Sequence, residues 1–342
     1  MKSGIKFNEF DSTNTRRVKK VNAFLDTAGL DPSPDIEVYV SAKEGDEMIA
    51  CGGLSGKVLK CIAVAPHKRG EGLILTIMSQ LLNAAYARDR KELFLFSKPK
   101  YLSFFEECGF HLIEQCNDEI MLMENTHNLA LYKKELAAHK KEGELIGSIV
   151  MNANPFTLGH QYLVTEAAKR SSWLHLFVVK EDASAFAFKD RIALIRQGVA
   201  HLSNVTVHEG SDYIISKATF PTYFIKDKGR IDALYAMLDL SIFKHHLAPI
   251  LGITHRFVGT EPYCKLTNHY NQTMKVLLEK EEEDAPPIHV VEIERMTFEH
   301  QAISASRVRR LLAQKNYEEL SRIVPHTTLE FLMKEVANDA NY

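Results

Sequence analysis

The sequence predicts an α/β protein of two domains, in which a Rossmann-like, doubly wound parallel sheet follows an N-terminal α+β domain. The chain has 342 residues, which is more than one hydrophobic core usually serves. From about residue 145, short apolar segments alternate with helical ones, as is typical of a parallel sheet with helices on both faces. Before that point several strand-like segments follow one another and a helix comes after them, which favours an α+β domain.

The N-terminal domain is predicted to comprise residues 1–124. Residues 36–66 have the pattern of a meander of short strands, with turns at 44–46 and 55–57. After this meander we expect a helix over 73–89, a buried strand over 92–97, a short helix over 103–110 and closing strands over 111–115 and 119–124.

Residues 125–144 are polar and densely charged, and we expect them to form a helical linker because they contain no Pro/Gly/Ser run. The C-terminal domain then comprises residues 145–342. Strand–helix–strand crossovers are right-handed, so its helices should cover the sheet on both faces. The predicted strands are 145–152, 173–179, 204–210, 254–262 and 288–294, and the predicted helices are 159–171, 188–202, 240–251, 268–280 and 304–315.

The composition is that of an ordinary globular protein, with 45% apolar and 25% charged residues. A net charge of −2 argues against a general electrostatic grip on nucleic acid. The N-terminus lacks an apolar secretory core and no stretch approaches a membrane span, so we expect neither export nor a membrane.

No metal site is predicted. The cysteines form no CxxC pair; they are Cys51, Cys61, Cys108, Cys116 and Cys264. The histidines His245, His246 and His269 have no metal-binding partner at position i+4. These features favour a reduced, cytoplasmic protein.

The first candidate site lies between a predicted strand and a predicted helix, in the segment NANPFTLGH over residues 152–160. A helix N-terminus presents unpaired N–H groups, so such a turn at the carboxyl end of a parallel strand can bind phosphate. Gly159 would permit close backbone approach to a nucleotide, and His160 could stabilise charge on a phosphate oxygen. For this motif taken alone, a helix start with an incidental histidine remains an open alternative.

A second candidate site follows the last predicted strand, in the segment ISASRVRR. Ser304 and Ser306 begin a helix, and Arg307, Arg309 and Arg310 occupy its first turns. Hydroxyls, free N–H groups and arginines at one helix N-terminus suit a polyphosphate. Arginine there opposes the helix dipole, which makes it an unusual choice for stability alone. The alternative is a capping serine with a solvated basic face.

A third candidate site occurs in the N-terminal domain, in VAPHKRGEGLI over residues 64–74. Its glycines free the backbone to approach a pyrophosphate, and the following helix supplies N–H donors. The alternative is a basic surface turn before a helix.

The first two motifs resemble the (H/T)xGH and ISxSxxR signatures of the nucleotidyltransferase superfamily, in the order found there. This resemblance implies that Thr157 and His160 contact the α- and β-phosphates of ATP, and that the adenine lies near 259–261. Ser304, Ser306 and Arg309 would hold the β- and γ-phosphates. The implied catalytic residues are His160, Thr157 and Arg309, and the implied ATP-binding residues are Asn152, Asn154, Pro155, Phe156, Gly159, Gly259, Glu261, Ser304, Ser306 and Arg307.

The third motif resembles the RxxGxG/A coenzyme A loop of the GNAT acetyltransferases, with Arg69 and Gly72 at its first two defined positions and Ile74 where that family has Gly or Ala. Residues 104–110 fit the end of the same fold. The resemblance implies that a coenzyme A-like prosthetic group is bound by Val64, Arg69, Gly70 and Gly72.

A GNAT-like domain ahead of such a nucleotidyltransferase domain, together with NPFTLGH and the stretch FVGTEPYCKLTNHYN over 257–271, resembles the citrate lyase ligase family over nearly the whole chain. The resemblance implies an enzyme that activates acetate with ATP as acetyl-adenylate and releases pyrophosphate. It implies Mg²⁺ held mainly by the ATP phosphates. The acetyl group would pass to the thiol of a dephospho-CoA-type prosthetic group on the acyl-carrier (gamma) subunit of citrate lyase. The implied partners are acetate and that subunit.

Other functions stay open at this point. The C-terminal domain could transfer AMP to a phosphorylated cofactor precursor. The N-terminal domain could acetylate an amine from acetyl-CoA, or it could only dock the carrier subunit. Lys189 and Arg191 could reach phosphate, but a solvated helix face is the favoured interpretation.

Overall fold

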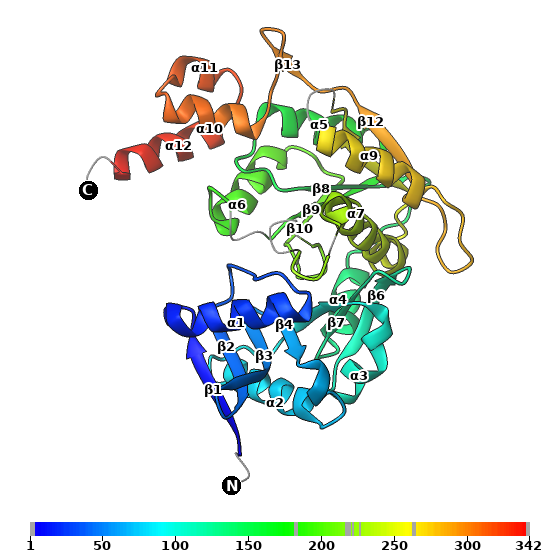
Figure 1. The fold of residues 1–342 in the computed structure, drawn as a ribbon. Coiled ribbons are helices and arrows are strands. Elements are labelled where there is room, and N and C mark those ends of the chain that lie inside the picture. The colour runs from blue at the N-terminus through cyan, green and yellow to red at the C-terminus, as the bar shows by residue number, and fades with distance from the viewer. Residues whose placement is uncertain are drawn as a thin grey trace. The chain divides into compact units, whose positions relative to one another are not determined.

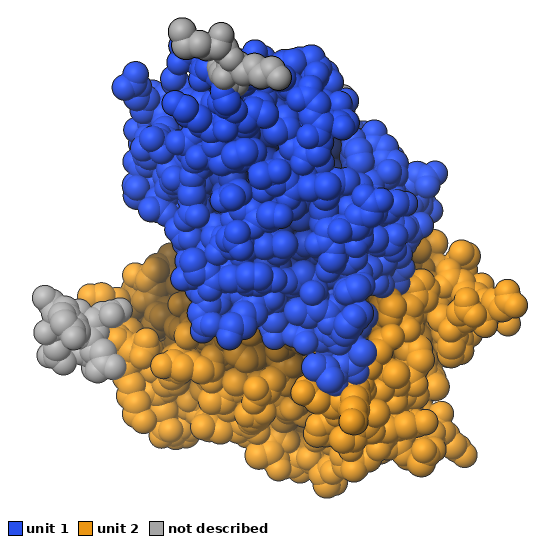
Figure 2. Space-filling model, turned by 90° about the horizontal axis from the view of Figure 1, so that it is seen from below, with its two compact units in different colours: residues 1–131, 221–238 blue, residues 132–220, 239–342 orange. Residues whose placement is uncertain are grey.

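The computed structural model describes residues 4–180, 184–215, 220, 222–225, 227–261 and 265–339, so Cys264 lies outside the described residues. The chain forms two compact units, which Figure 2 draws in separate colours. We call residues 1–131 with 221–238 the N-terminal unit, and residues 132–220 with 239–342 the C-terminal unit. Residues 221–238 had been predicted to belong to the C-terminal domain, whereas the structure places them in the N-terminal unit.

The N-terminal unit is built around a seven-stranded sheet in the order β1-β2-β3-β4-β5-β7-β6 (Figure 1). Neighbouring strands are antiparallel except β4 and β5, which are parallel. The predicted meander is confirmed as β2, β3 and β4, whereas β1 was not predicted. The strands are β1 (Ile5–Asp11), β2 (Val38–Glu44), β3 (Glu47–Ser55), β4 (Val58–Val64), β5 (Phe94–Ser97), β6 (His111–Cys116) and β7 (Ile120–Glu124).

Helices α1 (Thr15–Ala28) and α2 (Leu73–Tyr86) contact the central strands β3 and β4 of this sheet. Apolar residues recur along α2 at helical spacing, and they are buried in the main core of the unit: Leu73, Ile77, Met78, Leu81, Ala84 and Ala85. Shorter elements are the 3₁₀ turns Pro66–Lys68 and Pro99–Tyr101 and helix α3 (Leu102–Glu107). Helix α4 (Asn128–Ala137) falls in the predicted linker.

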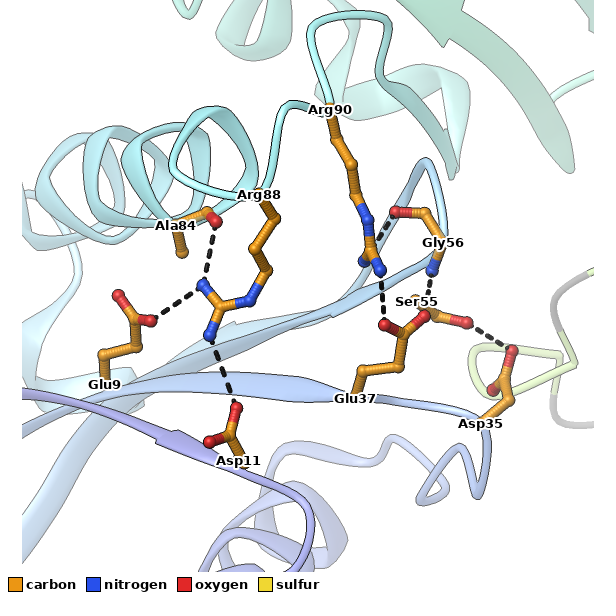
Figure 3. A network of polar contacts seen from close by, with 9 residues as sticks. All are labelled: Glu9, Asp11, Asp35, Glu37, Ser55, Gly56, Ala84, Arg88 and Arg90. Atoms are coloured by element: carbon orange, nitrogen blue, oxygen red, sulfur yellow. Dashed lines mark hydrogen bonds and ion pairs between the residues drawn. The ribbon is translucent and has the colours of Figure 1, made fainter.

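Two arginines that follow α2 fasten its end to the sheet (Figure 3). Arg88 donates to the carboxylate of Glu9 on β1 at 2.9 Å. Arg90 donates to Glu37 at 2.5 Å and to the carbonyl of Gly56, in the β3–β4 turn, at 3.1 Å. Because these side chains are partly exposed, each ion pair adds little to stability, and their main effect is to fix the register of α2 against the sheet.

The C-terminal unit is built around a five-stranded sheet in the order β10-β9-β8-β11-β12, in which all neighbours are parallel. In chain order this is 3-2-1-4-5, so the winding direction reverses between β8 and β11. The predicted doubly wound sheet is therefore confirmed, and ligands of such sheets bind at the carboxyl ends of strands beside the reversal. The strands are β8 (Ile146–Met151), β9 (Trp173–Val178), β10 (Val205–His208), β11 (His255–Gly259) and β12 (His289–Ile293).

The helices connecting these strands largely match the predicted ones. They are α5 (Leu158–Arg170), α6 (Phe188–Val199), α7 (Ile231–Ile242), a π-helical turn over Phe243–Leu247, α8 (Ala248–Leu251), α9 (Lys265–Leu278) and α10 (Ala305–Ala313). Helix α7 begins earlier than the predicted helix over 240–251, and it follows the 3₁₀ turn Lys228–Arg230. The hairpin β13 (Thr297–Phe298) and β14 (Gln301–Ala302) and the helices α11 (Tyr317–Ser321) and α12 (His326–Asp339) were not predicted.

Helices α10 to α12 share a small apolar cluster that includes Val308, Leu320 and Leu332. The residue just before α10, Ile303, belongs to the same cluster. This packing fixes the N-terminal end of α10. Within the described part of the chain, no helix combines the length and apolar character needed to cross a bilayer.

Candidate functional site

The turn between β8 and α5 holds the first predicted motif. Its backbone is set by a cis peptide bond between Asn154 and Pro155 and by a left-handed conformation at Ala153. Thr157 is the N-cap of α5 and is fully buried. Its hydroxyl accepts from the backbone N–H of His160 at 3.3 Å, while the backbone N–H of Thr157 donates to Nδ1 of His160 at 3.1 Å. The two residues therefore close a capping box, and the histidine substitutes for the usual Glu or Gln.

The capping box also determines which nitrogen of His160 carries the proton. Burial, and secondarily the positive charge of Arg295, lower the pKa of His160 to about 4, so the ring is neutral at pH 7. Because Nδ1 accepts from Thr157, the single proton must sit on Nε2. The ring stacks on fully buried Phe156 at 5.8 Å between centroids. His160 is thus a neutral hydrogen-bond donor that is held in one orientation.

The second motif meets this turn directly, although the two are about half the chain apart. A Cβ atom added at Gly159 would lie 2.8 Å from the carbonyl oxygen of Ile303, the residue before the N-cap of α10. The guanidinium of Arg309, on the second turn of α10, donates to the carbonyl of Asn154. Leu158 donates its backbone N–H to the carbonyl of Ile323 at 3.0 Å. The N-termini of α5 and α10 therefore converge, as binding of a single ATP by both motifs requires.

The predicted serines lie at this convergence. Ser304 is the N-cap of α10, and its hydroxyl accepts from the backbone N–H of Arg307 at 3.2 Å. The hydroxyls of Ser304 and Ser306 are 3.0 Å apart, and Ser306 is exposed. Both hydroxyls and the free N–H groups of the first helical turn are donors suited to phosphate oxygens.

The carboxyl ends of β11 and β12 add a further pair of charged residues. Buried Glu261 follows β11 and pairs with Arg295, which follows β12, at 2.6 Å. A second tie comes from the hydroxyl of Thr260, which accepts from the backbone N–H of Arg295 at 3.3 Å. The carbonyl of Gly259 accepts from the amide of Asn271 at 3.2 Å. Arg295 was not among the predicted site residues, although it follows a parallel strand, where ligands of such sheets bind.

Two arginines are turned away from any open site. Arg191 is fully buried, so the favoured interpretation of a solvated helix face was wrong for this residue, whereas Lys189 is exposed. The guanidinium of Arg191 donates to the side chain of Asn152 at 2.6 Å and to the Val179 carbonyl at 3.1 Å. It therefore fastens the β8–α5 turn from within.

Arg307, which was predicted to bind ATP, is also buried, and its guanidinium contacts other parts of the protein. It is 5% exposed, pairs with Glu319 at 2.5 Å and donates to the carbonyls of Phe298 and Gln301. These contacts hold the β13–β14 hairpin and α11 against α10. Of the arginines in the second motif, Arg309 is the one whose guanidinium reaches the β8–α5 turn.

The third motif lies at a cavity of about 530 Å³ within the N-terminal unit, a volume typical of small-molecule sites. Val64, Arg69, Gly70 and Gly72 all line it, as does Ile74. Gly70 and Gly72 have positive φ angles of 86° and 72°, and Gly72 is the N-cap of α2. The loop therefore needs glycine for its conformation, since side chains rarely adopt such φ angles.

Cations gather at this cavity. Exposed Arg69 lines it together with Lys98 and Lys100 from the start of the turn after β5, and Lys68 pairs with Glu44 at 2.8 Å. Apolar lining from Ile62, Leu95, Phe104 and Phe105 lies in the same cavity. A charged loop at one side of an apolar cavity fits a ligand with phosphates at one end and an apolar arm at the other.

Comparison with known proteins shows the family of the chain. A family model described as the citrate lyase ligase C-terminal domain matches residues 146–332. The chain is 49% identical to citrate pro-3S-lyase ligase of Klebsiella pneumoniae over 319 residues, covering 93% of each chain. It is 44% identical to citrate pro-3S-lyase ligase of Escherichia coli (strain K12) over 327 residues, covering 95% of this chain and 93% of that protein.

A solved structure matches the N-terminal part more distantly. An acyl-CoA N-acyltransferase from Pseudomonas aeruginosa aligns over its whole length with 36% of this chain, at 15% identity and a TM-score of 0.31. The identity of the chain therefore rests on the sequence relatives, which cover both units with their motifs. A relative at nearly half identity over almost the full length, joined by the family model, leaves one assignment: the chain belongs to the citrate lyase ligase family.

Proposed function

We propose that this protein activates acetate with ATP and acetylates the thiol of a dephospho-CoA-type prosthetic group on the acyl-carrier subunit of citrate lyase. The observation that carries the proposal is the convergence of two helix N-termini, at Gly159 and at Ser304, with the donors His160 and Arg309. Family membership supports the choice of acid and acceptor, because the relatives are named citrate pro-3S-lyase ligases.

The first step needs no base from the protein. Acetate is ionised at neutral pH, and its oxygen attacks the α-phosphorus of ATP. The bond from the α-phosphorus to the bridging oxygen of the β-phosphate breaks, so that acetyl-adenylate forms and pyrophosphate leaves. Catalysis then consists of positioning and of stabilising the negative charge on the phosphoryl oxygens.

The residues at the converging helices suit that task. The Nε2–H of neutral His160 can donate to a phosphoryl oxygen, and its direction is fixed by the capping box with Thr157. Arg309 and the hydroxyls of Ser304 and Ser306 supply further donors for the departing pyrophosphate. Such donors stabilise charge without reorganising at the moment of reaction.

The same donor set bears on Mg²⁺. The side chains that carry the site donate hydrogen bonds, and the carboxylates of Glu261 and Glu319 are already paired with Arg295 and Arg307. Among the described residues, no group of three or more His, Cys, Asp or Glu side chains could hold a metal ion. The donor set therefore fits Mg²⁺ that is held mainly by the ATP phosphates, whose charge it would partly neutralise.

In the second step the thiol of the prosthetic group attacks the acetyl carbonyl of acetyl-adenylate. The bond to the phosphate oxygen breaks, AMP leaves, and the thiol proton passes to solvent. The cavity of the N-terminal unit, with Arg69, Gly70, Gly72 and Val64 in its lining, would bind the diphosphate end of the arm that bears this thiol.

Acetate-dependent exchange between ATP and pyrophosphate tests the first step. We expect His160→Ala to reduce this exchange by about 10²-fold or more, the usual scale for one preorganised donor. Because His160 also caps α5, His160→Gln is the matched control. Glutamine can keep the capping box, and so retain thermal stability, while it moves the donor.

Full exchange activity in His160→Ala would remove His160 from the reaction. A loss of exchange explained entirely by unfolding, with His160→Gln fully active, would assign the residue to helix capping alone.

A second candidate function is AMP transfer to a phosphorylated cofactor precursor, since the N-terminus of α5 can receive any nucleoside triphosphate. Omission of acetate separates the two functions. The proposed ligase makes no pyrophosphate from ATP without a carboxylate, whereas the alternative enzyme would do so with its phosphorylated substrate alone.

A further inference from the structure

Strands β4 and β5 separate at the cavity of the N-terminal unit. They pair only at Val58 with Phe94 and at Leu59 with Leu95, although β4 continues to Val64. Beyond Leu59 the strand bulges: the register with β3 shifts, and Cys61 has a left-handed φ of 54°. Backbone groups of both strands therefore face a gap instead of each other.

Tyr223 fills this gap. Its hydroxyl donates to the carbonyl of Phe96 on β5 at 3.4 Å and accepts from the backbone N–H of Cys61 on β4. Burial raises the pKa of Tyr223, so that the hydroxyl stays protonated. The carbonyl of Tyr223 accepts from the backbone N–H of Asp31 at 2.8 Å. The side chain thus bridges two strands that have lost their own pairing.

The segment that carries this tyrosine, Thr222–Ile225, is well anchored, and we call it the strap. Ile225 donates its backbone N–H to the carbonyl of Thr222 at 3.2 Å, which closes a turn. Phe224 is buried and lies edge-to-face with Tyr223 at 5.2 Å between centroids. A few residues later, Arg230 forms two contacts of 2.6 Å with the carboxylate of Glu119.

The strap and the glycine loop line the same cavity. Arg69, Gly70 and Gly72 supply a charged loop, while Tyr223 and Phe224 join Ile62, Ala63 and Leu95 in its lining. A coenzyme A-like ligand with its phosphates at the loop would run its apolar arm along β4. The arm would then end at the gap between β4 and β5, where Tyr223 stands.

We propose that the strap is the end wall of this cavity, and that Tyr223 shields the thioester of the acetylated arm from water and from amines. The N-terminal unit then holds the arm without passing its acetyl group to an amine. This inference rests on the proposed function, because it takes the dephospho-CoA-type arm as the ligand. It excludes the N-acetyltransferase alternative for the same cavity.

The test uses the full chain in excess over S-acetyl-dephospho-CoA. Hydroxylamine attacks the free thioester carbonyl and yields acetohydroxamate and the free thiol, which mass spectrometry of the small molecule quantifies. We expect the wild-type protein to slow this cleavage at least about tenfold, since a closed site excludes outside nucleophiles. The variant Tyr223→Ala should lose most of that protection while it binds dephospho-CoA within about threefold of wild type.

The matched control is Tyr86→Ala, at an exposed tyrosine of α2 outside the cavity lining. It should protect the thioester as the wild type does. If Tyr223→Ala fails to fold, the wild-type measurement can still refute the proposal, because a cavity with a closed end must slow the cleavage. Absent protection in the wild type, retained protection in a folded Tyr223→Ala, or acetylation of a lysine-containing peptide by the wild type would each overturn the proposal.

Acetate-dependent ATP–pyrophosphate exchange, measured on the same samples, keeps the two proposals apart. Normal exchange without protection of the thioester would support the ligase function and would reject only the proposal that the strap closes the cavity. Absence of exchange in the wild type would reject the ligase function, whether or not the thioester is protected.

Discussion

The two units each begin a helix with a glycine beside a proposed phosphate site, but they need that glycine for different reasons. In the C-terminal unit Gly159 lies inside α5, where a Cβ atom would lie 2.8 Å from the carbonyl oxygen of Ile303. In the N-terminal unit Gly72 has open space around a Cβ atom but a φ of 72°. One glycine is required by a neighbour and the other by its own backbone, although the sequence motifs look alike.

The surroundings of the two helix starts differ in the same way. The β8–α5 turn is braced by buried Arg191 and by the capping box of Thr157 and His160. The loop before α2 is exposed, and Gly72 makes no side-chain cap. A braced turn is ready for catalysis, because its donors are already aimed, whereas an open loop can adapt to a large flexible ligand.

Among the changes that compare the two units, the largest effect is expected from Gly159→Ala. The added methyl group must push the start of α5 away from Ile303, which separates the two helix N-termini. Acetate-dependent ATP–pyrophosphate exchange should fall by about 10²-fold, since misplacement of about 1 Å has that effect on a positioned site. The control Gly72→Ala should leave this exchange unchanged. Equal activity of both variants would contradict the distinction between the glycines.

Acid should weaken the C-terminal unit before the N-terminal one. His175 on β9 and His208 on β10 are buried, with Nδ1 and Nε2 2.8 Å apart, and burial lowers their pKa values to about 4 and about 3. The unfolded chain binds protons at these residues below about pH 6.5. Stability is therefore complete above pH 6.5 and declines as the pH falls toward 4, by on the order of 1 to 2 kcal/mol for each histidine at pH 5.

In the N-terminal unit, the corresponding contribution to stability is lost only at lower pH. Its most shifted carboxylate, Asp35, has a pKa lowered to about 2 by hydrogen bonds and by the charge of Lys60, against the cost of its burial. That contribution is present above pH 3.8 and is lost only as the pH falls toward 2. Fluorescence of Trp173, the one tryptophan of the sequence, reports on the C-terminal unit, and hydrogen exchange of β2 to β4 reports on the other. Equal destabilisation of both units at pH 5 would refute this difference.

A smaller effect is expected from the double variant Arg69→Ala, Gly72→Ala. Losing one charged donor and straining the loop should weaken the binding of dephospho-CoA and slow acetylation of the carrier by about tenfold. The exchange reaction of the C-terminal unit should be unaffected. The measurement is carrier acetylation by mass spectrometry beside exchange on the same preparation. Unchanged acetylation would show that the loop does not hold the arm.

Much of the fold could be predicted from local patterns. All five strands of the C-terminal sheet coincide with apolar segments that alternate with amphipathic helices, and the meander of the N-terminal unit was marked by its turns. The misses are of another kind. Helices α11 and α12 are stabilised by an apolar cluster shared with α10, so their own sequence carries a weak signal. Strand β1 depends on its pairing with β2.

The sequence by itself determined the order and chemistry of the motifs: a helix opened by Gly159 and His160, another capped by Ser304, and a loop that needs Gly72. Only the tertiary structure decided three long-range contacts. Gly159 packs against Ile303, and Arg307 forms an ion pair with Glu319. Tyr223 packs into the N-terminal unit. The reason is physical. Periodicity and capping arise from neighbours a few residues apart, whereas these contacts depend on how distant segments pack, which no local pattern encodes.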